Sequence, residues 1–434
     1  MKIVCIGGGP AGLYFAISAK LRNSAHDITV IERNPAGVTY GWGVTFSDDL
    51  LDGLYRNDPQ SAREIFDSPA SWGNQEVHVC STQPWGAELG GTQRAHLGGY
   101  GFAIGRKHLL DILVKRARDL GVDIQFQREV EDLSEFADAD VIIACDGAHS
   151  RVRKLHGEHF QTGVDVGRNK YVWLGTHRVF DSFMFAFEET AAGWIWFYSY
   201  PFNDDMTTFI VECSPETWTG LGFDELRPAD SIKLLEDIFA RHLDGHSLLS
   251  PIPGKTPWLN FTRITNTVWY HDNIVLMGDA AHTTHFSIGS GTTLAMQDAI
   301  ELADSLDSHD DLQVALKDYA EKRRTAIADA QSAAVSSTEW FENVPSYIDL
   351  PITQFSYSLW KRRGHYPPWR YQLHLATQIT PLRRARRAVS AVRNTLRARR
   401  RMKLPDIQVS ARPDIDSEMG LRTLQQRSRS TSTQ

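Results

Sequence analysis

The first residues with an evident chemical use are the glycines of residues 7–12, which read GGGPAG. An apolar run over residues 2–6 precedes them, and residues 13–20 follow with the pattern of a helix. A second apolar run over residues 28–31 ends at Glu32, 20 residues beyond the last glycine. This order of strand, glycine turn, helix, strand and acid is the full context of the dinucleotide-binding fingerprint. A glycine turn that binds nothing is the weaker interpretation.

Each part of the motif has a physical task. Gly7 makes the tight turn, Gly9 lets the backbone approach a pyrophosphate, and Gly12 allows the helix to pack closely on the strand. The start of the helix offers unpaired N–H groups to the phosphates, and Glu32 can accept hydrogen bonds from the adenosine ribose. A resident FAD and a transient NAD both use this fingerprint, so the motif alone leaves the choice open.

A second candidate lies well downstream, where residues 139–145 form an apolar run typical of a buried strand. The run breaks at Asp146-Gly147, and Arg151 and Arg153 follow. An Asp-Gly pair after a strand is most often a simple turn when it stands alone. Its weight here depends on the other nucleotide signals in the chain.

The third candidate has the same form. Residues 273–277 form a buried strand that opens onto Gly278-Asp279, followed by a glycine loop over residues 289–293 and a helical pattern over residues 294–303. Ligands of open α/β sheets bind at the carboxyl ends of strands, where Asp279 could bond ribityl hydroxyls. The N–H groups of the loop, at a helix start, suit a flavin ring edge that becomes anionic on reduction.

These three motifs, in this order, make the chain resemble the group A flavoprotein aromatic hydroxylases. The likeness runs from residue 1 to about residue 345, and the arginine that reaches FAD in that family corresponds to Arg106. Within the family, the chain is similar to the branch that includes salicylyl-CoA 5-hydroxylase and anthraniloyl-CoA monooxygenase. The segments that carry this likeness are GWGV at 41–44, WLGT at 173–176, FIVEC at 209–213, HFSIGSGT at 285–292 and WFEN at 340–343.

The resemblance implies a resident FAD, with NADH or NADPH and O2 as co-substrates. No second glycine fingerprint has the strand–turn–helix context, so we expect the nicotinamide to dock without a domain of its own. Reduced FAD and O2 would form a C4a-hydroperoxide that delivers an OH to an activated ring. The residues expected to hold the FAD are Gly7, Gly9, Pro10, Ala11, Gly12, Glu32, Arg33, Arg106, Asp146, Gly278, Asp279, Gly289, Gly291 and Thr292.

One departure from the family concerns His285 and Phe286, where many members carry two prolines. That loop passes beside the flavin ring in the family, so a titratable imidazole could face the chemistry. His285 is therefore the candidate catalytic residue, placed to steer a proton or to hydrogen-bond the ring substituent. A histidine that only packs, or bonds backbone, is an equally valid interpretation.

Composition limits the class of protein. The chain has 434 residues, of which 42% are hydrophobic and 23% charged, so it is foldable and long enough for two or three domains. No apolar run approaches the roughly 20 residues that span a bilayer, and the N-terminus lacks the form of a signal peptide. The four cysteines form no Cys-x-x-Cys pair and the histidines show no metal spacing. These features predict a cytoplasmic protein without a disulfide framework or a metal site.

The elements that carry these motifs predict an α/β fold. It would combine a Rossmann-like FAD-binding domain, an inserted antiparallel β-sheet substrate domain and a C-terminal helical basic extension. The expected boundaries are 1–75, 101–165 and 265–345 for the discontinuous FAD-binding domain, 76–100 and 166–264 for the substrate domain, 346–405 for the extension and 406–434 for a disordered tail.

The inserted sheet is predicted from runs rich in aromatic and β-branched residues over 171–179, 182–188, 193–200 and 207–213. Most of these aromatic side chains would form core, and some would wall a cavity for an aromatic substrate. The Trp194-x-Trp196 pair is similar to the start of a flavin halogenase signature, but the rest of that signature is missing.

Residues 310–343 read as helical. The candidates for the inner face of this helix are Tyr319, Ala320, Ile327 and Ala328.

Charge is unevenly distributed along the chain. Residues 350–405 contain 14 Lys and Arg and no Asp or Glu, so the remaining 32 basic and 53 acidic residues leave a balance of −21. The basic clusters could form a solvated helix, a membrane-surface helix or a phosphate clamp. Basic residues from Arg383 to Lys403 could steer coenzyme A or an acidic carrier protein to an acidic body. No nucleic-acid partner is expected.

The sequence therefore predicts an FAD-dependent hydroxylase of a salicylyl- or anthraniloyl-type thioester, with 5-hydroxylation of salicylyl-CoA as the first candidate. One alternative is a hydroxylase of a free or carrier-protein-bound aromatic acid in natural-product biosynthesis. Another is a flavin-containing binding protein without turnover. The ring position, the choice between NADH and NADPH, and the oligomeric state stay open.

Overall fold

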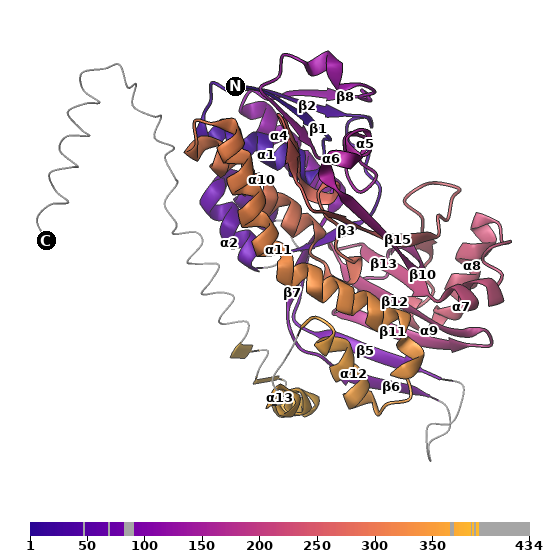
Figure 1. Ribbon diagram of the computed structural model, residues 1–434. Helices are drawn as coiled ribbons and strands as arrows, with labels where there is room; N and C mark the ends of the chain where they lie inside the picture. The colour runs from indigo at the N-terminus through magenta and orange to yellow at the C-terminus, as the bar shows by residue number, and fades with distance from the viewer. Residues whose placement is uncertain are drawn as a thin grey trace, which may run out of the picture.

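The computed structural model describes residues 1–46, 48–67, 70–81, 91–364, 369–382, 384–385 and 388–389, apart from the side chains of Asp48 and Thr377. In this part of the chain the strands form three sheets, and the helices gather mainly on one of them (Figure 1). The predicted α/β fold is confirmed.

A six-stranded sheet holds the N-terminal strand near its centre, in the order β16-β17-β9-β1-β2-β8. All of its neighbouring strands pair in parallel except β16 with β17. The central strands are short apolar runs, as expected of parallel strands buried on both faces. The bounds are β1 Lys2–Ile6, β2 Asp27–Glu32, β8 Asp123–Phe126, β9 Val141–Ala144, β16 Tyr270–His271 and β17 Ile274–Leu276.

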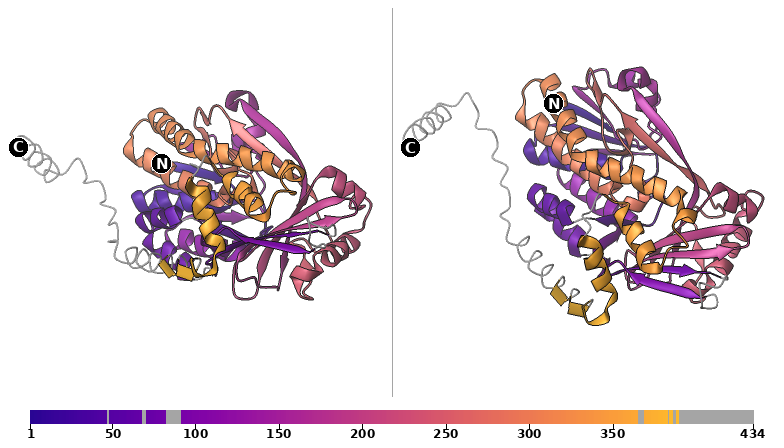
Figure 2. Two further views of the ribbon diagram at one scale, coloured as in Figure 1. Left: turned by 90° about the horizontal axis from the view of Figure 1, so that it is seen from below. Right: turned by 60° about the horizontal axis from the view of Figure 1, so that its bottom comes forward.

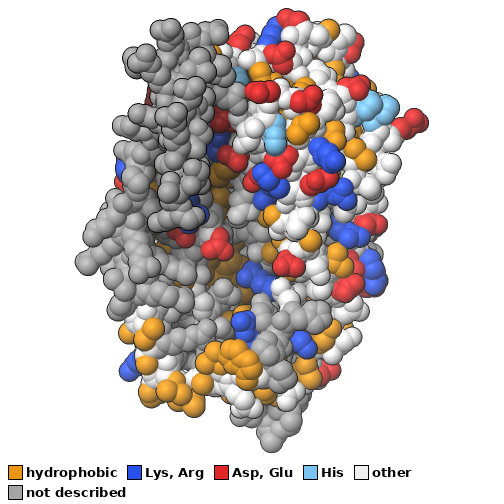
Figure 3. Space-filling model, turned by 60° about the vertical axis from the view of Figure 1, so that its left-hand side comes forward, with side chains coloured by type: hydrophobic (Ala, Val, Ile, Leu, Met, Phe, Trp, Pro, Cys, Tyr) orange, Lys and Arg blue, Asp and Glu red, His pale blue; other side chains and the backbone are white. Residues whose placement is uncertain are grey.

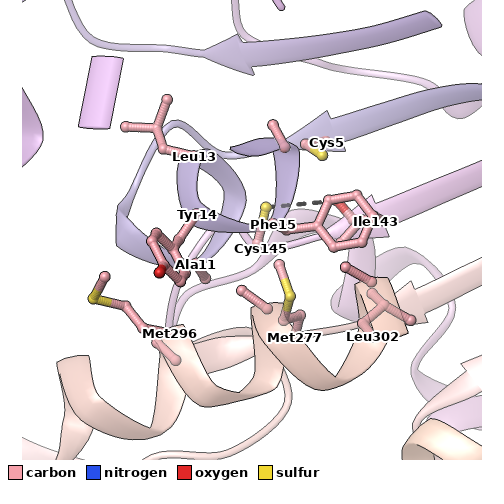
Figure 4. Close-up of a cluster of buried hydrophobic side chains, with 14 of the residues drawn as sticks. Cys5, Ala11, Leu13, Tyr14, Phe15, Ile143, Cys145, Met277, Met296 and Leu302 are labelled. Atoms are coloured by element: carbon pink, nitrogen blue, oxygen red, sulfur yellow. Dashed lines mark hydrogen bonds between the residues drawn. The ribbon is translucent and has the colours of Figure 1, made fainter. Parts of the chain in front are cut away.

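Three helices bury this sheet. Helix α1 (Pro10–Arg22) is buried along most of its length and packs against α4 (Arg106–Asp119) and α10 (Gly291–Ser308). Figure 4 shows the result, one cluster of apolar side chains drawn from β1, α1, β9 and α10. The glycine turn before α1 therefore lies beside this buried apolar cluster.

An eight-stranded sheet forms the second layer, in the order β14-β10-β13-β12-β11-β5-β6 with β15 pairing β10. The prediction of an antiparallel sheet is wrong at one place, because β5 and β11 pair in parallel. Strand β5 is contributed by a segment about a hundred residues before β11, so no hairpin fixes the direction of that pair. The bounds are β5 Gln75–Cys80, β6 Thr92–His96, β10 Thr162–Thr176, β11 Phe183–Thr190, β12 Gly193–Pro201, β13 Thr207–Cys213, β14 Leu248–Leu249 and β15 Leu259–Asn266.

The predicted strand over 207–213 coincides with β13, but β10 begins nine residues before the predicted start at 171. Its first half pairs with β15 and its second half with β13. Because exposed polar residues occupy much of the first half of β10, hydrophobicity alone does not predict a strand there.

Smaller elements join the two layers. A three-stranded sheet consists of β3 (Gly43–Phe46), β7 (Gly101–Gly105) and β4 (Ala70–Trp72). The long helix α11 (Leu312–Glu342) contacts both α10 and β10, so it spans the two layers, as Figure 1 and both views of Figure 2 show. The remaining helices are α2 Asp48–Asn57, α3 Pro59–Asp67, α5 Arg151–Leu155, α6 Gly157–Phe160, α7 Pro215–Gly220, α8 Pro228–Ile238, α9 Ala240–Leu243, α12 Ile352–Lys361 and α13 Trp369–Gln378.

The inner face of α11 differs from the prediction at one residue. Tyr319, Ala320 and Ile327 are buried as expected, but Ala328 is exposed. Arg323 is buried instead, since its guanidinium pairs with a buried carboxylate of α10. A count of apolar residues cannot anticipate a buried ion pair.

The C-terminal extension is described only in part. Helices α12 and α13 are helical as expected, whereas the predicted disordered tail and most of the basic residues from Arg383 to Lys403 lie outside the described residues. On the face shown in Figure 3, acidic and basic side chains are interspersed over the described surface. Among the described residues, no helix has both the length and the apolar character needed to cross a membrane.

Candidate active site

The glycine turn between β1 and α1 forms one wall of a cavity of about 680 Å³. Gly7 has a φ of +121°, and a Cβ at this position would lie 2.3 Å from the carbonyl oxygen of Cys145. A Cβ on Gly12 would lie 2.2 Å from the carbonyl oxygen of Gly7. Both positions therefore require glycine, the first for its backbone conformation and both for close packing.

Gly9 differs from these two glycines, because a Cβ there would meet nothing within 4 Å. It stands at the N-cap of α1 without a side-chain cap, and it lines the cavity together with Pro10 and Ala11. The free N–H groups of the helix start thus face open space. This is the arrangement that binds a phosphate group at a helix N-terminus.

The side chain of Glu32, at the end of β2, forms a hydrogen bond with the glycine turn. Its Oε2 accepts a hydrogen bond from the Gly8 N–H at 2.8 Å, and its Oε1 accepts from the Asn34 N–H at 2.8 Å. Glu32 and the neighbouring Arg33 both line the cavity. Oε1 also accepts from Asn34 Nδ2 at 2.6 Å, whereas Oε2 keeps a lone pair for a further donor, as a ribose hydroxyl would supply.

Asp146 also has acceptor capacity facing this cavity. Its Oδ2 accepts from the Arg151 N–H at 2.7 Å, whereas its buried Oδ1 has no hydrogen-bond partner among the described residues. Since buried polar atoms are normally paired, the free oxygen indicates a missing donor. Asp146 thus belongs to a turn, as is typical of an Asp-Gly pair after a strand, and it also lines the cavity.

Asp279 and Arg106 approach the same cavity from different elements. Asp279 follows β17, and Arg106 begins α4, where its Nε donates to Thr39 Oγ1 at 2.9 Å. Removal from bulk water lowers the pKa of the Arg106 guanidinium, an effect that the negative charges of Asp279 and Glu32 oppose. The cavity is thus lined by the N-terminus of α1 and, among its charged residues, by Arg106, Glu32, Asp146 and Asp279.

Two of the predicted residues, Gly291 and Thr292, line this cavity at the start of α10. Gly278 lies behind it, buried, with a φ of +62°. Gly289 instead lines a second cavity. A cavity of about 680 Å³ that is lined by the start of α1 and by carboxylates able to accept from ribose hydroxyls fits FAD.

The second cavity, of about 360 Å³, lies across the loop from the first. Residues 286–290 line the second cavity and residues 291–292 the first, so one loop borders both cavities. Eight of its 18 lining residues are aromatic, and they come from the three-stranded sheet, the residue before β7, the eight-stranded sheet and this loop: Phe46, Trp72, Tyr100, Phe102, Phe183, Tyr198, Tyr200 and Phe286. Such walls suit a planar aromatic ligand.

Tyr198, one of these walls, is held by a buried acid that the sequence did not single out. Its hydroxyl hydrogen-bonds Glu212, whose other oxygen accepts from Asn169 Nδ2 at 2.7 Å. Burial raises the pKa of Glu212 to about 8. The FIVEC segment thus contributes a carboxyl that fixes the orientation of a cavity wall.

His285 does not face either cavity. It is 3% exposed, its Nδ1 lies 2.7 Å from Ser287 Oγ, and its ring packs against Phe261 and Phe341. Burial, with a contribution from Arg362, lowers the pKa of His285 to about 3. The expectation that this imidazole faces the chemistry is not met, since it is Phe286 that lines the aromatic cavity.

A buried ion-pair cluster supports the turn that carries Asp279. Asp298, on α10, accepts hydrogen bonds from the Gly278 N–H at 3.1 Å, from His282 Nε2 at 2.8 Å and from Arg323 Nε at 2.7 Å. Burial alone would raise the pKa of Asp298, but His282 and Arg323 outweigh it and hold the pKa below its ordinary value. Only a buried Asp near the middle of a predicted helix could have signalled this cluster in the sequence.

A nucleotide cleft joined through one loop to an aromatic cavity defines an FAD-dependent aromatic monooxygenase. The chain belongs to the FAD binding domain family, whose model matches residues 1–334. The relatives below are named as a hydroxylase and a monooxygenase, which supports an enzyme over the alternative of a flavin-binding protein without turnover.

The chain is similar to salicyloyl-CoA 5-hydroxylase of a Streptomyces species, with 37% identity over 370 residues, which are 82% of this chain and 69% of that protein. It is 33% identical to 3-hydroxy-4-methyl-anthranilyl-[aryl-carrier protein] 5-monooxygenase of Streptosporangium sibiricum over 364 residues, 84% of this chain and 95% of that one. Among solved structures, 2-methyl-3-hydroxypyridine-5-carboxylic acid oxygenase superimposes with a TM-score of 0.63 at 19% identity, covering 85% of this chain and 97% of that chain. This last likeness concerns the fold alone.

Proposed function

We propose that the protein hydroxylates the ring of a salicylyl- or anthraniloyl-type thioester, with NADH or NADPH and O2 as co-substrates. The first candidate reaction is 5-hydroxylation of salicylyl-CoA. The relative with 37% identity is named for that reaction, and a second relative is named for an anthranilyl group on a carrier protein. FAD, when bound, supplies the redox chemistry with O2.

The observation that carries the thioester proposal is a small third cavity of about 70 Å³ beside the aromatic one. The two cavities share Gln75 and Arg363 as lining residues. The small cavity is otherwise bounded by residues 97–99 and by the end of α12, including Trp360. A free acid would need only the aromatic cavity, whereas a thioester needs a second space through which its arm leaves.

The side chains around the aromatic cavity can each be given a task. Tyr198 and Phe286 lie 5.8 Å apart between ring centres, at 68°, so they contact each other edge to face and together form a wall against which the substrate ring would pack. Arg363, whose Nη2 donates to Ser287 O at 3.3 Å and Ile288 O at 3.2 Å, places positive charge where the thioester carbonyl would lie. The aromatic side chains would displace water from beside the substrate ring.

The test is a panel of substrates with the purified, FAD-loaded protein. Salicylyl-CoA, anthraniloyl-CoA, the two free acids and a carrier-bound anthranilyl group are compared, with products read by mass spectrometry and peroxide measured in parallel. We expect hydroxylated thioester with little peroxide. If NAD(P)H is oxidised with every thioester and only peroxide forms, the proposal fails. If the free acid is the better substrate, the thioester assignment alone is withdrawn.

A further inference from the structure

Cys80, Glu188 and His242 meet inside the eight-stranded sheet region, away from both large cavities. Cys80 ends β5, Glu188 lies opposite it on β11, and His242 comes from α9. The Cys80 Sγ lies 3.9 Å from His242 Nε2, which lies 2.8 Å from Glu188 Oε1. The three ligand atoms lie within 4.8 Å of one another, and the residues are 1%, 4% and 8% exposed.

The geometry distinguishes a metal site from a nucleophilic relay. In a relay, the thiol uses one nitrogen of the imidazole and the carboxylate orients the ring through the other. Here Cys80 Sγ and Glu188 Oε1 both approach the same nitrogen, Nε2 of His242. The three atoms therefore surround one point, as the ligands of a metal ion do.

A fourth residue points to the same conclusion. His78 precedes Cys80 by two positions on β5 and so lies on the same face of the strand. It is 6% exposed, and its ring centre is 5.6 Å from that of His242. Neither ring nitrogen has a hydrogen-bond partner among the described residues, and the nearest carboxylate oxygen, Glu76 Oε2, is 3.5 Å from Nε2. A buried imidazole without a hydrogen bond is costly, and a bound metal would satisfy it.

We propose that Cys80, Glu188 and His242 bind a zinc ion, with His78 turning to complete a tetrahedral site. Thiolate, imidazole and carboxylate together match the ligand preferences of zinc. Zinc–ligand bonds of about 2.3 Å to sulfur and about 2.0 Å to nitrogen would place the two atoms about 3.6 Å apart, close to the observed separation of Cys80 and His242. The His242–Glu188 contact would open by about half an ångström.

Charge also favours a dication at this point. Bound zinc would be ligated by the thiolate form of Cys80 and by the Glu188 carboxylate, and the thiol proton would pass to water. These two negative charges would balance the charge of the ion. Arg241 Nε lies 3.4 Å from Glu188 Oε1, so a metal ion would compete with this guanidinium for the carboxylate. The Arg241 side chain is half-exposed.

The position of the site implies a structural role. Phe183, at the other end of β11, lines the aromatic cavity and is five residues from Glu188, or about 16 Å along the strand. The ion would tie β5, β11 and α9 together without touching the reacting groups. Sequence patterns do not indicate this site, because its ligands have no regular spacing along the chain.

Metal analysis of the purified, FAD-loaded full chain tests the proposal. After dialysis against a weak chelator, we expect about one equivalent of zinc in the wild type and at least about tenfold less in Cys80→Ser and His242→Ala. Cys213→Ser is the matched control, because Cys213 is equally buried in the same sheet but belongs to no such cluster among the described residues. Strong chelators should lower the Tm of the wild type and of the control, not of Cys80→Ser, and hydroxylation should persist in all.

A second measurement does not depend on any variant folding. Cobalt added to chelator-treated wild-type protein should give a thiolate-to-cobalt charge-transfer band and the visible absorption of tetrahedral cobalt, read against the flavin protein without metal. Absence of both bands, or zinc content equal in the wild type and in Cys80→Ser, would show that the cluster is held by hydrogen bonds alone.

Discussion

His282 donates from Nε2 to Oδ2 of Asp298 at 2.8 Å, and this same oxygen accepts the N–H of Gly278. The pair therefore connects the body of α10 to the turn that presents Asp279 to the nucleotide cleft. Removing the charge of Asp298 leaves Arg323 buried beside a neutral amide. We expect Asp298→Asn to lower the free energy of unfolding by about 3 kcal/mol, measured by urea denaturation, and to weaken FAD binding.

Asp304→Asn is the control for this prediction. Asp304 lies on the same helix, is 52% exposed on its side chain, and pairs with Arg22 at 3.5 Å. Because exposed ion pairs contribute little, its loss should cost less than about 1 kcal/mol. Equal effects of the two variants would show that the Asp298 cluster does not support the turn.

The glycines of the first turn should separate into two classes. Gly7→Ala forces a side chain onto the carbonyl of Cys145 at a φ of +121°, so we expect the apoprotein to lose about 2–3 kcal/mol of stability or to fail to fold. Gly9→Ala meets no protein atom and should leave the apoprotein stability within about 0.5 kcal/mol. Its methyl group would instead enter the cleft, so FAD titration should show weaker binding. A Gly9→Ala protein that binds FAD normally would contradict the placement of the phosphates.

This first turn shows what a sequence can predict. The tasks of Gly7, Gly9 and Gly12 follow from neighbours within a few residues and from two adjacent strands, so the local pattern was sufficient. Asp298 acts across the fold, on a turn 20 residues away and on Arg323 from another helix. No local pattern specifies that partnership, because it exists only once α10 and α11 have packed.

The position of His285 shows the same limit of sequence-based prediction near the aromatic cavity. The sequence predicts that this residue lies in a loop beside the flavin, and in the structure residues 286–290 of this loop line the second cavity and residues 291–292 the first. Packing decides which side chain of the loop faces the cavity. The His285 ring packs against Phe261 and Phe341, and Phe286 lines the aromatic cavity. Likewise, the parallel pairing of β5 with β11 depends on a contact between distant segments.

Burial of His285 predicts a pH dependence of stability. Its pKa is about 3 in the folded protein and about 6.5 when unfolded, so the unfolded state binds the extra proton between these values. The contribution of the neutral imidazole is complete above about pH 6.5 and declines as pH falls, reaching a loss of about 2 kcal/mol at pH 5. His285→Gln should therefore lose less stability than the wild type between pH 7 and pH 5 in urea titrations.

His177→Gln, at an exposed histidine, serves as the control and should follow the wild type. Because His285 lines neither cavity, His285→Gln should also keep its ratio of hydroxylated product to peroxide across this pH range. A pH-dependent fall in that ratio, with FAD still bound, would restore a direct part in catalysis for the imidazole.

Arg363 offers the sharpest test of the thioester arm, because it lines both the aromatic cavity and the small cavity beside it. Arg363→Met keeps most of the side-chain length but removes the charge and the hydrogen bonds to Ser287 O and Ile288 O. If the thioester carbonyl lies beside the guanidinium, the KM for salicylyl-CoA should rise about tenfold, the effect of one lost charge-assisted hydrogen bond. The KM for free salicylate, measured with the same enzyme, should change less.

Lys361→Met, on the exposed side of α12, removes a nearby charge without touching either cavity and should leave both constants unchanged. A rise of equal size for the acid and the thioester would mean that Arg363 only holds the loop, and that the arm leaves by another route.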